Sequence, residues 1–199
     1  SGPLTGLSVA VPANLSVRGW PTRAGSAALA GYRALEDATI VARLRQAGAT
    51  LVGVAEMSEY GLGLDGNAAG RTLPEGRAGI EIVLDLLGEA RLAAARTGVF
   101  GFKPSAGIVS RCGLIGLMPS LEAVGLLARS SREIAAVMAV IAGTDDGDPA
   151  LYGGAMPDFS RPDAAPLLRT VGLVREALAG LTTDETETFA AAFERLRAA

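Results

Sequence analysis

The stretch Asp37-Ala-Thr-Ile-Val-Ala-Arg-Leu-Arg-Gln-Ala-Gly48, followed after two residues by Leu51-Val-Gly-Val54, decides the fold of this chain. Three apolar residues of the first segment recur at i, i+1 and i+4, the spacing of one helix face: Ile40, Val41 and Leu44. Asp37 or Thr39 is suited to open this helix, and Gly48 is suited to follow its C-cap. The second segment is short and apolar, which predicts a buried strand.

Another strand is predicted before the helix. Leu7-Ser-Val-Ala-Val-Pro12 alternates apolar residues and ends at a proline, which cannot donate to a strand ladder. A strand, a helix and a strand in this order are typical of a parallel sheet. We therefore predict an α/β domain with a mixed, mainly parallel sheet layered with helices. Residues 13–34, rich in Gly, Pro, Ser and Ala, are predicted to be mostly loop.

The remaining segments are less uniform. Ile80, Ile82 and Leu84 alternate as in a strand, but residues 80–96 also satisfy a helical stripe, so both interpretations stay open. Ser130 or Ser131 caps a predicted helix that runs through Ala142, and residues 145–166 are predicted to be loop. A strand is predicted over residues 169–174. The final helix begins at Thr182 and carries an apolar stripe: Phe189, Ala192, Phe193 and Leu196.

The composition bounds the class of protein. At 199 residues and 49% hydrophobic content, the chain can bury a core and is most simply one domain over residues 1–199. A net charge of −3 indicates neither a nucleic-acid nor a membrane surface. The single cysteine, Cys112, excludes an internal disulfide and suits a reducing, cytoplasmic setting. The absence of histidine excludes a Ser-His-Asp or Cys-His pair. We expect no metal and no cofactor.

Several motifs together resemble the amidase signature family, which includes the A subunit of the glutaminyl-tRNA amidotransferase. They are the two segments quoted first, Met57-Ser-Glu-Tyr60, Asp85-Leu-Leu-Gly-Glu-Ala-Arg91, Gly101-Phe-Lys-Pro104, residues 107–120 and residues 124–129. The match runs from about residue 2 to residue 175 and leaves 176–199 as a C-terminal helix. Amidases of this family usually run to more than twice this length. The resemblance favours a strand over residues 80–84, with a turn at Gly88 and a helix from about Arg91.

The same resemblance indicates which chemistry is missing. Family members hydrolyse amides with a nucleophilic serine, a second serine that bridges, and a lysine that accepts the proton. Residues 67–77 stand at the bridging position and contain no serine. Pro12 stands at the lysine position and has no titratable group. Glu89 stands at the nucleophile position. We therefore predict no catalytic residue and a vestigial site made of Pro12, Asp85, Gly88, Glu89 and Arg91.

Two catalytic alternatives remain. Lys103, the single lysine, could pair with a relocated serine, which makes the chain an amidohydrolase that acts on a small amide. The candidate serines are Ser105, Ser110 and Ser120. Asp85 and Glu89 could instead form an acid–base pair, although carboxylates at a turn are usually solvated. We predict that Glu89 faces solvent or pairs with Arg91, because burying an unpaired charge is costly. The adjoining cleft should then be shallow or filled.

The function that we favour is therefore that of a pseudoenzyme, a non-catalytic amidase-like protein with a scaffolding, stabilising or regulatory role. A decayed amidase without a selected activity is the third hypothesis; the apolar strand at residues 51–54 argues against it. A partial α/β sheet exposes a strand edge and an apolar face. We therefore expect a homo-oligomer or a heteromeric protein complex, with no nucleic acid, membrane or metal as a partner.

Overall fold

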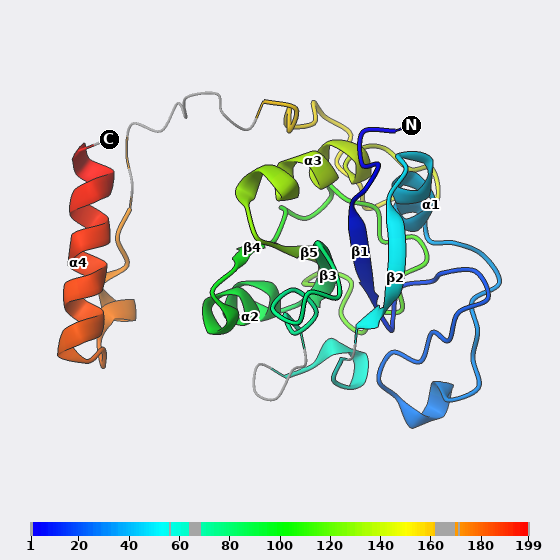
Figure 1. The fold of residues 1–199 in the computed structure, drawn as a ribbon, viewed down its shortest axis with the longest axis horizontal. Helices are drawn as coiled ribbons and strands as arrows, with labels where there is room; N and C mark the ends of the chain where they lie inside the picture. Colours follow the sequence, from blue (N-terminus) through cyan, green and yellow to red (C-terminus); the bar gives the residue numbers. More distant parts are fainter. Residues whose placement is uncertain (1, 56, 64–68, 162–169, 171, 199) are drawn as a thin grey trace. The chain divides into compact units, whose positions relative to one another are not determined.

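The computed structural model describes residues 2–55, 57–63, 69–161, 170 and 172–198. The chain divides into two compact units, residues 1–163 and residues 164–199. The first unit contains a five-stranded open sheet with the strand order β2-β1-β3-β5-β4 (Figure 1). Its strands are β1 (Ser8–Pro12), β2 (Thr50–Ala55), β3 (Ile80–Asp85), β4 (Phe100–Phe102) and β5 (Ala123–Ala128).

The sheet is mixed and is parallel across β2, β1 and β3, in agreement with the mixed, mainly parallel sheet that the sequence predicts. β1 runs parallel to both β2 and β3, so that Val9 lies opposite Leu51 on one side and Ile80 on the other. β5 runs antiparallel to β3 and to β4, between which it lies. The strands predicted over residues 7–12 and 51–54 are confirmed. Residues 80–85 form a strand buried along its whole length, which decides the ambiguous segment in favour of the strand.

Among the described residues of the first unit, three α-helices occur: α1 (Thr39–Gln46), α2 (Glu89–Thr97) and α3 (Ser131–Ile141). The predicted helix over residues 37–47 is confirmed as α1, but its N-cap is Ala38, without a side-chain hydrogen bond. Asp37 instead forms an ion pair with Arg45: the Arg45 Nε lies 3.0 Å from the Asp37 Oδ2. α3 begins at the predicted place and is held by a capping box between Ser130 and Glu133.

The helices pack on both faces of the sheet. α1 and α3 contribute to one apolar cluster with strand residues such as Val9, Ile82 and Leu126. α2 contributes to a second cluster on the opposite face, with Val83 and Leu127. These assignments follow the alternation of side chains along β3 and β5. The sheet therefore has helices on both faces, and its central strands are covered on both sides.

Two glycines allow α2 to lie close to the sheet. A Cβ atom on Gly101 of β4 would lie 2.7 Å from the Ala90 carbonyl oxygen, and one on Gly125 of β5 would lie 2.9 Å from the Ala90 Cβ. Neither approach leaves room for a side chain. The first turn of α2 is thus fixed against β4 and β5, and this fixes the turn that leads into it from β3.

The second unit contains the final helix, α4 (Thr183–Ala198), which confirms the helix predicted from Thr182. The Thr182 hydroxyl accepts a hydrogen bond from the Glu185 N–H at 3.3 Å, and the Glu185 carboxylate accepts one from the Thr182 N–H at 2.8 Å. The strand predicted over residues 169–174 is wrong for residues 170 and 172–174, which form no strand. Residues 172–174 are exposed and lack a ladder partner. Residues 169 and 171 lie outside the described residues.

Candidate functional site

The carboxyl end of β3 carries a buried charge with three partners. The Asp85 side chain is 0% exposed, and its Oδ1 lies 3.1 Å from Lys103 Nζ and 3.7 Å from Arg91 Nη2. Its Oδ2 accepts a hydrogen bond from the Ala90 N–H at 3.0 Å. Asp85 therefore links the end of β3 to the first turn of α2 and to the residue that follows β4. A buried carboxylate needs such compensation, because desolvation of an unpaired charge is costly.

Glu89, at the start of α2, directs its carboxylate back into the turn that precedes it. Glu89 Oε2 accepts hydrogen bonds from three successive backbone N–H groups, those of Leu86 and Leu87 at 2.8 Å each and that of Gly88 at 3.1 Å. Glu89 is 3% exposed. Three amide donors on one oxygen form a small anion-binding concavity, and its anion is supplied by the chain itself.

This position contradicts the prediction that Glu89 faces solvent or pairs with Arg91. The Arg91 side chain is 58% exposed, and its described ion pair is with Asp85. The charge of Glu89 is compensated by backbone amides and by the positive end of α2. An arginine is not required, because the turn itself supplies N–H donors that point the same way. Gly88 holds this turn at φ 133°, a conformation that L side chains rarely adopt.

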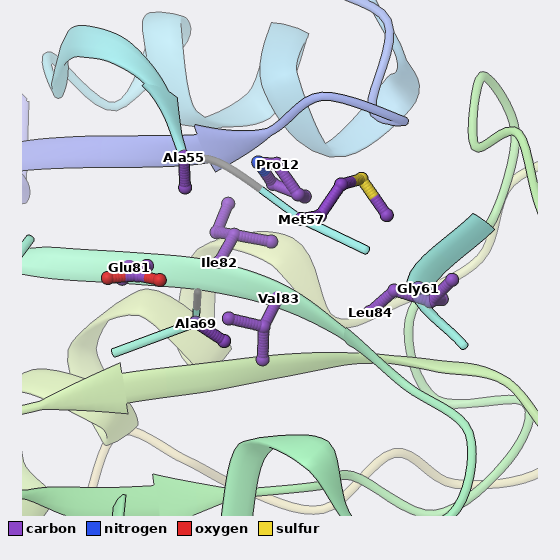
Figure 2. Close-up of a pocket in the computed structure, with 9 residues that line it drawn as sticks. All are labelled: Pro12, Ala55, Met57, Gly61, Ala69, Glu81, Ile82, Val83 and Leu84. Carbon is purple, nitrogen blue, oxygen red and sulfur yellow. The ribbon is translucent and has the colours of Figure 1, made fainter. Parts of the chain in front are cut away.

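Pro12, at the end of β1, is separate from this cluster. It lines a small cavity between β1, β2 and β3 together with Ala55, Met57 and Ile82 (Figure 2). The cavity measures ≈ 10 Å³, about the space of one water molecule. Among the described residues, the side chains around Pro12 therefore leave almost no empty space beside it. The proline ring contributes an apolar wall where the family resemblance places a lysine.

Glu81, within β3, is a buried carboxylate outside the predicted site. It is 0% exposed. Its carboxylate accepts hydrogen bonds from the Gly70 N–H at 2.7 Å, from the Thr72 N–H at 3.1 Å and from the Thr72 hydroxyl. Glu81 thus attaches the loop before β3 to the α2 face of the sheet. The position of Glu81 between Ile80 and Ile82, in an otherwise apolar strand, is the feature of the sequence that could have indicated its burial.

Lys103 is not positioned as a base for any of the three candidate serines. Besides its ion pair with Asp85, its ammonium donates hydrogen bonds to the carbonyl oxygens of Leu86 at 2.8 Å and Leu121 at 3.1 Å. Two of the three ammonium donors are thus used on carbonyl groups, and the ion pair holds the ammonium group beside Asp85. An amine accepts a proton only when a lone pair is free, so this arrangement argues for a structural role.

The described contacts of the candidate serines do not include Lys103. The Ser110 hydroxyl donates to the Asp145 carboxylate and accepts the Cys112 N–H at 3.1 Å. Ser105 and Ser120 line a cavity of ≈ 170 Å³. Two charged side chains that line this cavity have partners. The Glu122 carboxylate accepts hydrogen bonds from the N–H groups of two successive residues, and Arg111 forms an ion pair with Asp148.

The structure thus brings four of the five residues of the predicted vestigial site together. Asp85, Gly88, Glu89 and Arg91 lie around one turn, with Lys103 as an additional member, while Pro12 lines its own cavity. The sequence offers Lys103 as a structural member of the Gly101–Pro104 motif or, alternatively, as a base; its ion pair with Asp85 was missed. Within the described ranges, no group of three or more Cys, Asp or Glu residues is arranged to hold a metal ion. No described helix is long and apolar enough to cross a membrane.

Comparison with known proteins gives a consistent family match. The family model described as Amidase matches residues 1–73 and 85–199. The A subunit of the glutamyl-tRNA(Gln) amidotransferase of Natronomonas pharaonis is 37% identical over 225 residues, which cover 100% of this chain and 53% of that protein. The corresponding protein of Deinococcus deserti is 36% identical and is covered over 45% of its length. The chain spans about half the length of the curated relatives it matches.

Solved structures agree with the sequence comparison. The A subunit of the glutamyl-tRNA(Gln) amidotransferase of Thermotoga maritima superposes with a TM-score of 0.73 at 27% identity, over 78% of this chain and 39% of that one. A chain of an inhibitor-bound vestigial protein complex, related to the origins of an s-triazine catabolic enzyme, gives a TM-score of 0.75 at 28% identity. That match covers 79% of this chain and 39% of the other.

Proposed function

Because the chain belongs to the amidase family, we propose that it is a non-catalytic member with a scaffolding, stabilising or regulatory role in a protein complex. One observation carries the non-catalytic part of the proposal. The residue at the position of the family nucleophile is Glu89, and its carboxylate occupies the backbone donors of the adjoining turn. A substrate carbonyl has neither a nucleophile nor a free set of donors at this place.

Proton transfer is a further requirement that this chain does not meet. Hydrolysis through an acyl intermediate needs a nucleophile and a base within hydrogen-bond reach of it. Pro12 supplies no base at the end of β1. Lys103 donates hydrogen bonds to two carbonyl groups and forms an ion pair with Asp85. The loss of a general base alone reduces a rate by roughly 10²- to 10⁴-fold.

The sheet edges support the part of the proposal that concerns a complex. β2 and β4 are the outer strands of the described sheet, and Phe100 of β4 is 53% exposed. Exposed edge strands offer unpaired backbone groups to another chain. The matched relatives are named as subunits of an amidotransferase, and one solved neighbour is a protein complex. For this chain we propose assembly with copies of itself or with another protein, in the cytoplasm.

A turnover screen with a labelling control tests the catalytic part. We expect no hydrolysis of simple amides, esters or glutamine and no serine labelling by a fluorophosphonate probe. Glu89→Ser restores a hydroxyl but no base, so this variant should also be inactive. Turnover in the wild type that is lost in Lys103→Ala would overturn the proposal and favour the relocated-dyad alternative. Turnover in Glu89→Ser would show that a proton acceptor exists beside the turn.

Co-purification tests the part that concerns a complex. The whole chain carrying an affinity tag is recovered from the native host and passed over a size-exclusion column at several concentrations. We expect a species larger than one chain, with a stoichiometric second protein or with further copies of this one. Recovery of the chain alone, as a monomer at every concentration, would contradict the proposal.

A further inference from the structure

The cavity of ≈ 170 Å³ that Ser105 and Ser120 line has a buried carboxylate in its wall, that of Glu122. We propose that this cavity binds a small aliphatic primary amine, whose ammonium group is held by Glu122. Neither Asp85 nor Glu89 lines the cavity. The proposal concerns binding at a separate place and does not depend on the proposed lack of hydrolysis or on the proposed complex.

The Glu122 carboxylate is only half satisfied by the protein. Glu122 is 7% exposed, and its Oε2 accepts hydrogen bonds from the N–H groups of Leu117 at 3.0 Å and Met118 at 3.3 Å. Among the described contacts, its Oε1 accepts no hydrogen bond, and no lysine or arginine forms an ion pair with it. A buried carboxylate without a full set of partners is unfavourable. Glu122 Oε1 is therefore suited to accept a charge-assisted hydrogen bond from a ligand.

The balance of charge around the cavity favours a cation. Arg111 is the other charged lining residue, and its guanidinium is compensated: Nη2 lies 3.5 Å from Asp148 Oδ1, and Nη1 donates to the carbonyl oxygen of Pro119. The Arg111 backbone N–H also donates to Asp148 Oδ2 at 2.8 Å. Because the charges of Arg111 and Asp148 offset each other, Glu122 leaves the cavity with a net negative charge. A cationic ligand is therefore attracted, and an anion of the same size is repelled.

The rest of the lining indicates a primary amine with a short carbon chain. Ser105 and Ser120 supply two hydroxyl groups that have no described hydrogen bond to the protein. An ammonium group has three N–H donors, which matches one carboxylate oxygen and two hydroxyl oxygens. Most other lining residues are apolar, Val109 and Val124 among them. The volume of ≈ 170 Å³ is more than ten times the roughly 10–15 Å³ that one water molecule requires, so several carbon atoms fit.

A titration of the whole ¹⁵N-labelled chain with n-butylamine hydrochloride near neutral pH tests the proposal, with ionic strength held constant by sodium chloride. We expect saturable shifts of the amide resonances of Ser105, Leu117, Met118 and Ser120. The dissociation constant should be on the order of 1–10 mM, because so small a ligand gains little free energy. Butanol, which lacks the charge, should bind about tenfold or more weakly. Sodium butyrate, which carries the opposite charge, should cause no saturable shift.

Matched variants make the result specific. Glu122→Gln keeps an acceptor for the Leu117 and Met118 N–H groups but removes the charge, so n-butylammonium should bind about tenfold or more weakly. Ala106→Leu fills the cavity and leaves Glu122 in place, so it should abolish binding and decides the question if Glu122→Gln does not fold. Glu75→Gln removes an exposed carboxylate outside the cavity and should leave the dissociation constant unchanged.

Three results would overturn the proposal. The first is the absence of a saturable shift with n-butylammonium in the wild type. The second is equal binding of n-butylammonium and butyrate, because Glu122 then does not select the charge of the ligand. The third is an Ala106→Leu or a folded Glu122→Gln variant that binds n-butylammonium as tightly as the wild type does.

Discussion

Asp85 is the residue at which a single substitution should cost most at this end of the sheet. Asp85→Asn removes the charge that faces Lys103 at 3.1 Å, and the wild-type carboxylate is 0% exposed. Breaking a buried pair by removing one partner costs about 3–5 kcal/mol. We expect the lower end of that range, about 3 kcal/mol, because the Lys103 side chain is 22% exposed and can regain water. Urea denaturation measures the difference in free energy of unfolding between the two proteins, provided that both unfold with the same m-value.

An exposed ion pair supplies the control for this substitution. Arg77 Nε lies 2.6 Å from Glu75 Oε2, with side-chain exposures of 61% and 51%. Glu75→Gln should change the free energy of unfolding by no more than about 0.5 kcal/mol. If Asp85→Asn lowers the free energy of unfolding no more than Glu75→Gln does, then the Asp85–Lys103 pair does not stabilise the end of β3.

Asp145 gives the chain a titration that depends on neighbouring hydroxyls. Hydrogen bonds from Ser110, Thr39 and the Gly147 N–H, in that order of importance, lower the pKa of Asp145 from 3.8 to about 2. A depressed pKa stabilises the folded state above the unfolded value of 3.8 and loses that contribution as the pH falls through about 2. The difference in free energy of unfolding between the wild type and Asp145→Asn should therefore narrow as the pH falls from 3.8 to about 2.

Ser110→Ala tests the assigned cause. Removing the Ser110 hydroxyl should raise the pKa of Asp145 toward 3.8. An NMR titration that monitors the carboxyl resonance of Asp145 measures this change. Asp158 serves as the internal control, because its pKa is lowered mainly by Ser160. Ser110→Ala should leave the titration of Asp158 unchanged. Equal shifts at both aspartates would instead indicate a general change in charge or folding.

The sequence identifies residues of the candidate site better than it predicts their environments. The motif from Asp85 to Arg91 places Glu89 at the position of interest, but the sequence predicts it in solvent or beside Arg91. Its burial depends on where three backbone N–H groups point, and no side-chain pattern records that direction. Lys103 is likewise visible as the single lysine, while its partner Asp85 lies 18 residues earlier in the chain and meets it only in the folded sheet.

At the scale of elements, α3 offers a local test of how its start is specified. The Ser130 hydroxyl accepts the Glu133 N–H at 3.2 Å, and the Glu133 carboxylate accepts the Ser130 N–H at 2.9 Å. Ser130→Ala should lower the free energy of unfolding by about 1 kcal/mol. Ser131→Ala, one residue later on an exposed position, should be neutral or slightly stabilising. Equal losses in both variants would show that the capping box does not stabilise α3.

Elements with a local signal were predictable, and elements defined by long-range pairing were less so. α3 and α4 have capping residues and apolar stripes within a few residues, α1 has an apolar stripe, and β3 is an alternating run that also fits a helical stripe. β4 is three residues long and exists because β5 pairs with it, so its own sequence carries little signal. β5, Ala123–Ala128, is wholly buried and apolar, which was available as a signal. The strand predicted over residues 169–174 had a suitable composition, but the described residues 170 and 172–174 have no ladder partner.

At the scale of the whole molecule, α4 should take part in self-association. Phe189 and Leu196 are 38% and 61% exposed, and Phe193 lies between them on the same helical stripe. Light scattering across a concentration series should show a species larger than one chain. Phe189→Glu combined with Phe193→Glu should reduce its mass, whereas Glu187→Gln on the same helix should not. A strictly monomeric wild type, unchanged by the double substitution, would rule this interface out.

The place of β5 between β3 and β4 has a consequence for the order of events during synthesis. β4 ends at Phe102, whereas β5, its ladder partner, begins only at Ala123. At about 5–20 residues per second, a ribosome needs about one to four seconds to add the intervening residues. During that interval β3 lacks its neighbour on this side and β4 lacks any. The parallel half formed by β1, β2 and β3 can pair first, and the open sheet is complete only when residue 128 has emerged.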